Sequence, residues 1–259
     1  MKNNGYPYFE DDETCKVTIQ ETPYEPAGKF VQSLNPLRQC CRCYKIISMG
    51  ANGPIGACSY QTRAKDVITV HITKQMPVSL LYEFVKSEPP QGDQDMRSKE
   101  IYAIDCEMVY TVKGLALARL SVTDFDSVLV LDVIVKPPTK VLDANTRYSG
   151  LTLKQVNDAK DNLESCRLKL LKFINSETLL EGHSLECDLK ALRLVHHNVV
   201  DTAVMYLRNG RKVSLRQLSS EVLGKQIQRN NSATFGHNSA EDAEAILSLM
   251  KHKIQQMML

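Results

Sequence analysis

The chain has 259 residues, enough for one or two domains. With 43% hydrophobic and 24% charged residues its composition is that of a globular protein, which excludes a wholly disordered chain. The 32 basic and 30 acidic residues give a net charge of +2, which excludes nucleic-acid binding through bulk positive charge alone.

No apolar run approaches the roughly 18–20 residues that a membrane span needs, so we expect no membrane partner. The N-terminal residues lack the apolar stretch of a secretory signal. An intracellular protein is therefore expected, with its eight cysteines as thiols or metal ligands rather than disulfides. No Lys/Arg-rich nuclear import sequence stands out, so the sequence does not decide between the nucleus and the cytosol. We favour the nucleus.

The N-terminal third contains three segments that differ in composition and in sequence pattern. Residues 1–35 show no clear periodicity and are expected to be extended or disordered. Residues 36–86 hold a cysteine cluster and several glycines, and predict a small irregular module with a strand at 67–72 and a helix at 78–86. The polar stretch 87–99, with its Pro-Pro pair and glycine, predicts a linker.

Residues 100–259 are predicted to form a second domain of class α/β, with helices packed on a mixed sheet. Three strands with short connections come first and predict an antiparallel meander, at 101–110, 114–124 and 127–138. Helical and strand patterns then alternate, as a helix at 162–174, a strand at 178–183, a helix at 184–195, a strand leading into a helix at 198–206, and helices at 214–223 and 238–256.

Two carboxylates lie on the first predicted strand of this domain. Asp105 and Glu107 are two residues apart, so both side chains point to one face of the strand. The surrounding residues are apolar, and two carboxylates in such surroundings repel each other and lose hydration. A divalent cation such as Mg²⁺ compensates this well, because it prefers oxygen ligands. An exposed strand face with two solvated acids is the alternative that this pair alone leaves open.

Three further residues complete a possible catalytic set. Asp188 lies in the first turns of a predicted helix within GHSLECDL, and Asp242 lies in the first turn of the last predicted helix. His237 precedes that helix on a loop, where it is free to reach a bound water. Taken singly, each acid is also explained by the helix dipole, which favours negative charge at a helix N-terminus.

The order Asp-x-Glu, GHSxxxD and His-x4-Asp resembles the DEDDh exonuclease superfamily over roughly residues 100–256. Several short segments are similar to the RNA exonuclease 1 homologue, or GOR-like, group: CEM after Asp105, TRYSG, GHSLECDL, DTA, SLRQL and HNSAEDA. The resemblance implies a ribonuclease-H-like fold with a mixed five-stranded sheet flanked by helices. It also implies a phosphodiester hydrolase that degrades single-stranded RNA from a free 3′ end to nucleoside 5′-monophosphates.

The resemblance further assigns roles to individual residues. Two Mg²⁺ or Mn²⁺ ions would be held by the four carboxylates, and His237 would act as the general base. Met108 would pack on the terminal nucleotide and Arg147 would contact its ribose or phosphate. Core packing for Met108 and a surface charge for Arg147 are the alternatives. Asp201, at a strand end, is expected to cap the following helix.

The cysteine cluster contains only some of the ligands expected for a zinc site. Cys40 and Cys43 have the C-x2-C spacing of zinc sites, and Cys58 is a candidate third ligand. The GOR-like group carries a histidine where this chain has Gln61, and no later CC pair follows. His71 is the candidate substitute as fourth ligand, and a degenerate module that retains only thiols is the alternative.

Two rival functions remain open from the sequence. The first is a catalytically weak or silent protein that binds RNA or serves as a scaffold, and the second is a 3′–5′ exonuclease that acts on DNA. The complete set of five catalytic positions argues against the first rival. The second shares the same metal chemistry, so only the resemblance separates it from a ribonuclease.

Overall fold

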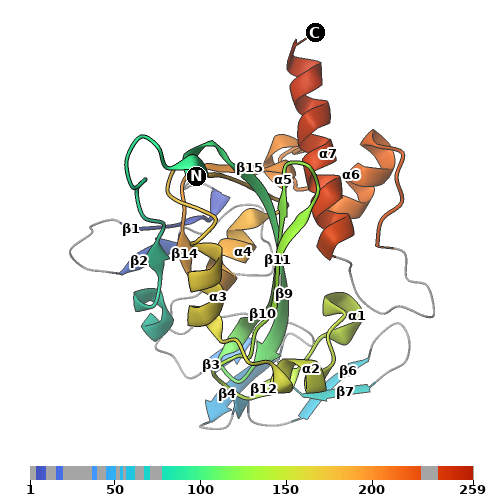
Figure 1. The fold of residues 1–259 in the computed structure, drawn as a ribbon. Helices are drawn as coiled ribbons and strands as arrows, with labels where there is room; N and C mark the ends of the chain where they lie inside the picture. The colour runs from blue at the N-terminus through green and yellow to red at the C-terminus, as the bar shows by residue number, and fades with distance from the viewer. Residues whose placement is uncertain are drawn as a thin grey trace.

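A computed structural model shows how the chain folds (Figure 1). It describes residues 4–9, 16–19, 37–39, 45–50, 53–54, 57–61, 67–70, 78–228 and 239–258. The central element is a mixed sheet in the strand order β11–β10–β9–β13–β15, and β12 pairs with β9 beside this path. The bounds are β9 Ile101–Thr111, β10 Gly114–Asp124, β11 Leu129–Ile134, β12 Val141–Asp143, β13 Leu179–Gly182 and β15 Val199–Asp201.

The first three strands form the predicted antiparallel meander, because two short turns connect them. β13 and β15 run parallel to β9, and each is reached through a helical connection. The predicted mixed sheet is therefore confirmed. β12 is an addition of only three residues, too short for alternation to reveal it in the sequence.

Helices cover both faces of the sheet. On one face, α3 (Leu163–Leu170) and α4 (Leu185–Leu192) pack on Ile104 and Cys106 of β9. On the other, α6 (Leu215–Val222) and α7 (Ser239–Met258) share a core with Ala103. Three short helices complete the domain, α1 (Thr146–Ser149), α2 (Leu153–Asp158) and α5 (Thr202–Met205).

Segments from the N-terminal third pack against this domain. β1 (Pro7–Phe9) pairs with β2 (Val17–Ile19), and β8 (Val85–Lys86) pairs in parallel with β14 (Leu194–Val195). Val17, Leu81, Phe84 and Val195 form one buried cluster, so residues far apart in the sequence share a core. The predicted helix at 78–86 is a 3₁₀ helix over Val78–Tyr82, followed by β8.

Short strands account for the described part of the cysteine-containing region. They are β3 (Leu37–Gln39), β4 (Ile46–Gly50), β5 (Gly53–Pro54), β6 (Ala57–Gln61) and β7 (Val67–Val70). β3, β4 and β5 form one antiparallel sheet, and β6 pairs with β7. The strand expected at 67–72 is therefore present as β7.

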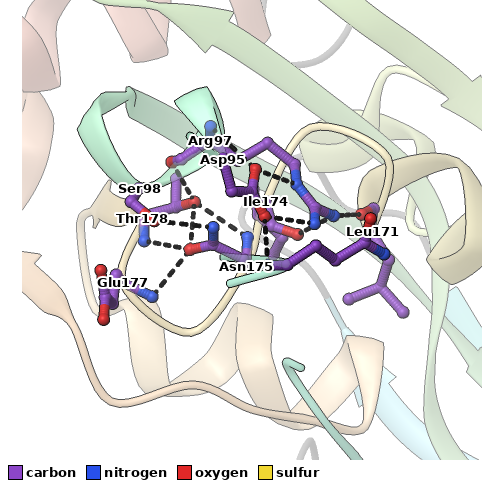
Figure 2. A network of polar contacts seen from close by, with 9 residues as sticks. Asp95, Arg97, Ser98, Leu171, Ile174, Asn175, Glu177 and Thr178 are labelled. Atoms are coloured by element: carbon purple, nitrogen blue, oxygen red, sulfur yellow. Dashed lines mark hydrogen bonds and ion pairs between the residues drawn. The ribbon is translucent and has the colours of Figure 1, made fainter. Parts of the chain in front are cut away.

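The stretch expected to be a linker, 87–99, is hydrogen-bonded to the domain (Figure 2). Arg97 pairs with Asp95, with 2.6 Å between Nη2 and Oδ2, and its Nη1 donates to the carbonyls of Leu171 and Ile174. Thr178 Oγ1 donates to the carbonyl of Arg97 at 2.6 Å. These bonds fix the start of β9 beside the start of β13.

Within the described ranges, no helix combines the length and the apolar character that crossing a membrane requires.

Glu181 is a buried charge of the core. It lies on β13 with none of its surface exposed, and neither carboxylate oxygen has a hydrogen-bond partner. Burial raises the pKa of Glu181 to about 8, against the attraction of Lys251 on α7. A carboxyl group of this kind is largely neutral near pH 7 in the folded protein. Because burial disfavours its charged form, the folded state loses stability as the pH rises.

We expect Glu181→Leu to raise the free energy of unfolding by about 1–4 kcal/mol at pH 9, with a much smaller gain at pH 5. The folded pKa lies above the unfolded value, so wild-type stability falls as the pH rises from about 4.5 to about 8. Urea unfolding of both proteins at the two pH values measures the difference. Glu177→Leu, at an exposed position nearby, should change stability by less than about 0.5 kcal/mol. An equal effect of Glu181→Leu at both pH values would contradict the buried-charge explanation.

Candidate active site

The first two carboxylates of the candidate site lie on β9. Asp105 and Glu107 alternate with Ile104 and Cys106, so they lie on the face of the sheet that also carries Ala103 and α7. Glu107 is only 7% exposed. The sequence expectation that both acids share a largely buried face is confirmed, and the alternative of two solvated acids is wrong.

Asp188 reaches β9 from the opposite direction. β13 pairs with β9 only as far as Glu181 and Ala103, so β9 extends beyond its partner. α4 begins in the space after β13, and Asp188 Oδ1 accepts the backbone N–H of Cys106 at 2.9 Å. The carboxylate thus replaces the missing strand neighbour and lies beside Asp105.

Gly182 allows α4 to start so close to the sheet. A Cβ at this position would lie 2.9 Å from Leu185 Cβ and 2.7 Å from its Cδ1. Leu185 is fully buried in the core, and its Cβ cannot rotate away. Only glycine therefore fits between the end of β13 and the first turn of the helix that carries Asp188.

Asp242 enters from the first turn of α7, which packs against β9, β10 and β13. Its side chain is almost fully buried, and the residue is 2% exposed. The side-chain amide of Gln228 donates to both of its oxygens, at 3.2 Å to Oδ1 and 3.1 Å to Oδ2. The prediction that Asp242 faces the sheet from a helix start is consistent with this position.

The four carboxylates interact in the order Asp188, Asp105, Glu107 and Asp242. Burial, together with the charges of Asp105 and Asp242, raises the pKa of Glu107 to about 9, with Arg119 opposing. Burial and Asp105 together raise the pKa of Asp188 well above its ordinary value. Burial also raises the pKa of Asp242 to about 6. Each carboxylate is therefore destabilised in its charged form by lost hydration or by a neighbour.

Such a set of donors suits hard cations. All four side chains are carboxylates, the type of ligand that Mg²⁺ and Mn²⁺ prefer, and a cation would offset their repulsion. Among the residues with described positions, no three His, Cys, Asp or Glu side chains already form a closed metal-binding group. The set fits the cations by its chemistry and burial, and its members lie in a row rather than in a preformed cage.

Four sequence-predicted site residues lie outside the described residues. His237, the expected general base, falls in the segment 229–238, directly before α7. Cys40, Cys43 and His71, three of the possible zinc ligands, fall in other undescribed segments. The fourth, Cys58, is buried on β6.

The two expected substrate contacts lie close to β9. Met108 is half-buried, and strand alternation turns it to the face opposite Glu107. Arg147 is exposed on α1, which packs against β9, and its guanidinium lies 5.8 Å from the ring centroid of Tyr148. Both roles stay predictions.

Asp201 holds the loop before α4 in place. Its side chain accepts the backbone N–H of Ala203, which confirms the predicted cap of α5, and also that of Ser184, both at 2.9 Å. Tyr6 Oη donates to Asp201 Oδ2 at 2.9 Å. No local pattern marks Tyr6 or Gln228, because each contacts a residue that is distant in the chain.

Comparison with known proteins places these features in context. The chain is 43% identical to the human RNA exonuclease 1 homolog and 35% identical to the chimpanzee exonuclease GOR, in each case over 99% of its own length. It spans only 23% and 40% of these two relatives. No family model matches the chain.

A solved structure supports the fold. The Saccharomyces cerevisiae Pan2 pseudoubiquitin hydrolase–RNA exonuclease module, solved in complex with AAGGAA RNA, superimposes with a TM-score of 0.54 and is 26% identical. The match covers 66% of this chain and 32% of the Pan2 chain. The expected ribonuclease-H-like α/β fold is confirmed by this likeness together with the mixed sheet.

Proposed function

Because the chain belongs to the RNA exonuclease 1 and GOR-like group of exonucleases, we propose that it hydrolyses single-stranded RNA from a free 3′ end and releases nucleoside 5′-monophosphates. The observation that carries the proposal is the row of four carboxylates, three of which are buried. It joins β9, α4 and α7, which are separated by long stretches of sequence. Grouping like charges in this way lowers the stability of the fold, because the carboxylates repel one another and lose hydration. Such groups are typical of functional sites.

Two divalent cations, Mg²⁺ or Mn²⁺, are the cofactors that we propose for this row, and they would supply an acidified water and neutralise charge on the phosphate. Asp105, Glu107, Asp188 and Asp242 would hold them. Hydrogen bonds to Cys106 N–H and Gln228 already restrain two of these carboxylates. Preorganised ligands of this kind need little rearrangement at the moment of reaction.

The remaining steps fall to side chains around the row. His237 would take a proton from the attacking water, a task that suits an imidazole at neutral pH. Arg147 would bind the terminal ribose or phosphate, and Met108 would pack on the terminal nucleotide. Selection of single strands would come from stacking and from contacts to the sugar.

The zinc site of Cys40, Cys43, Cys58 and His71 stays a prediction, as do the nuclear location and the domain boundaries at residues 36, 87 and 100. A module beside the nuclease domain would be placed to bind further RNA or a protein partner.

Degradation of labelled oligonucleotides tests the proposal directly. Single-stranded RNA and DNA of the same sequence, labelled at the 3′ or the 5′ end, are incubated with the protein in Mg²⁺, Mn²⁺ or EDTA. We expect immediate release of labelled mononucleotide from 3′-labelled RNA, a ladder from 5′-labelled RNA, and no reaction in EDTA. Faster degradation of DNA would favour the DNA exonuclease, and RNA binding without cleavage in either metal would favour the silent scaffold.

A further inference from the structure

Gln228 is the described residue immediately before the segment that carries His237, and it contacts two acids of α7. Its backbone N–H donates to Glu241 Oε2 at 3.1 Å, and its side-chain amide donates to both oxygens of Asp242 at 3.1 and 3.2 Å. Gln228 therefore links the end of the described stretch 78–228 to the first turn of α7.

The chain approaches Gln228 along a fixed path. Ile227, only 3% exposed, is buried in the core that α6 and α7 share. Lys225 pairs with Glu244 of α7, with 2.9 Å between Nζ and Oε1, and its carbonyl accepts the hydroxyl of Ser219. Gln228 itself has a φ of 53°, a left-handed conformation that a residue with a side chain adopts only when its surroundings require it.

The amide of Gln228 does not by itself occupy all the lone pairs of Asp242. An ionised carboxylate has about four lone-pair sites, and the amide of Gln228 uses at most two of them. Because the amide touches both oxygens, it fixes the rotation of the carboxylate group as well as its position. Outer groups that orient a metal ligand in this way act through the ligand and do not contact the metal.

We propose that Gln228 is a positioning residue that orients Asp242 for a divalent cation. The proposal rests on the proposed function, which makes Asp242 a metal ligand. The alternative is that the amide blocks the carboxylate and must leave before a cation binds. The two roles predict opposite changes in cation affinity when the amide is removed. Removing a blocking group strengthens cation binding, and removing a positioning group weakens it.

Gln228→Met distinguishes the two roles, because methionine keeps the length of the side chain and removes the hydrogen-bond donor. Mn²⁺ binding to the full chain is measured by calorimetry without RNA, and RNA degradation is measured across a Mg²⁺ series. We expect Mn²⁺ affinity to fall roughly 10–100-fold and the half-saturating Mg²⁺ concentration to rise by a similar factor. The rate should recover much of its wild-type value at saturating Mg²⁺, a separation that general damage to the fold would not produce.

The matched control is Gln217→Met. Gln217 is exposed on α6, and its amide donates to Glu221 Oε1 at 2.8 Å, so it loses the same kind of bond away from the carboxylate row. This variant should keep wild-type Mn²⁺ affinity. Gln228→Leu, which also lacks a donor and adds no charge, should weaken binding to a similar extent and serves where the methionine variant does not fold.

Each remaining outcome decides one of the two proposals. Unchanged or tighter Mn²⁺ binding in Gln228→Met would overturn the positioning role. Absence of Mn²⁺ binding by the wild-type protein would overturn it as well, together with the metal assignment. Mn²⁺ binding that depends on Gln228 in a protein that degrades neither RNA nor DNA would retain the positioning role and reject the nuclease function.

Discussion

Asp105→Asn should abolish exonuclease activity while leaving the protein folded. Asn keeps the size of the side chain and removes the negative charge that a cation requires. The loss of several kcal/mol of charge stabilisation corresponds to a rate reduction of about 10³-fold or more. Initial rates on 5′-labelled RNA in saturating Mg²⁺ measure the change.

The same substitution should leave stability unchanged or raise it. Asp105 repels both Glu107 and Asp188, and that repulsion disappears with the charge. Activity and thermal midpoint are therefore expected to move in opposite directions, as is common for sites that trade stability for function. Asp126→Asn, in an exposed turn, should alter neither. Full activity of purified Asp105→Asn would reject the metal-ligand assignment.

His237→Ala should reduce the turnover rate by roughly 10²–10⁴-fold, the usual contribution of a general base. The reaction then proceeds without a group to accept the proton of the attacking water. The substitution should have little effect on Mn²⁺ affinity, because the four carboxylates are intact. Rates across pH 5.5–9 provide a second measurement, since the limb assigned to imidazole titration in the wild type should vanish in the variant.

The control for His237 is His197→Ala, which removes an exposed histidine that lies outside the carboxylate row. It should retain the wild-type rate and pH profile. An unchanged turnover rate in His237→Ala would remove that residue from the role of base and would direct attention to other proton acceptors near Asp105.

The elements that the sequence predicted are those with strong local signals. An apolar run predicts β9, alternation of apolar and polar residues predicts β10, and the cap residue Ser214 with the following glycine predicts α6. β12, α1 and α2 have no such pattern, because elements of three to six residues are too short to show a period. The capping box between Thr152 and Gln155 is the one local signal for α2.

For the candidate site, the sequence identified the acids but not what supports them. Spacing on one strand placed Asp105 and Glu107 together, since alternation is a local property. The contacts of Gln228 with Asp242 and of Tyr6 with Asp201 depend on how distant segments pack. The stretch 87–99 has the composition of a linker, yet Arg97, which pairs with Asp95, donates to backbone carbonyls of the domain, a contact that composition does not reveal.

The close approach of α4 to the end of β13 also has an evolutionary consequence. Position 182 accepts a side chain only if the residue at 185 gives up its own volume, because the two Cβ positions compete for the same space. A single change at either position would disturb the orientation of Asp188 or leave a void, so viable descendants of this chain should change both positions together or neither.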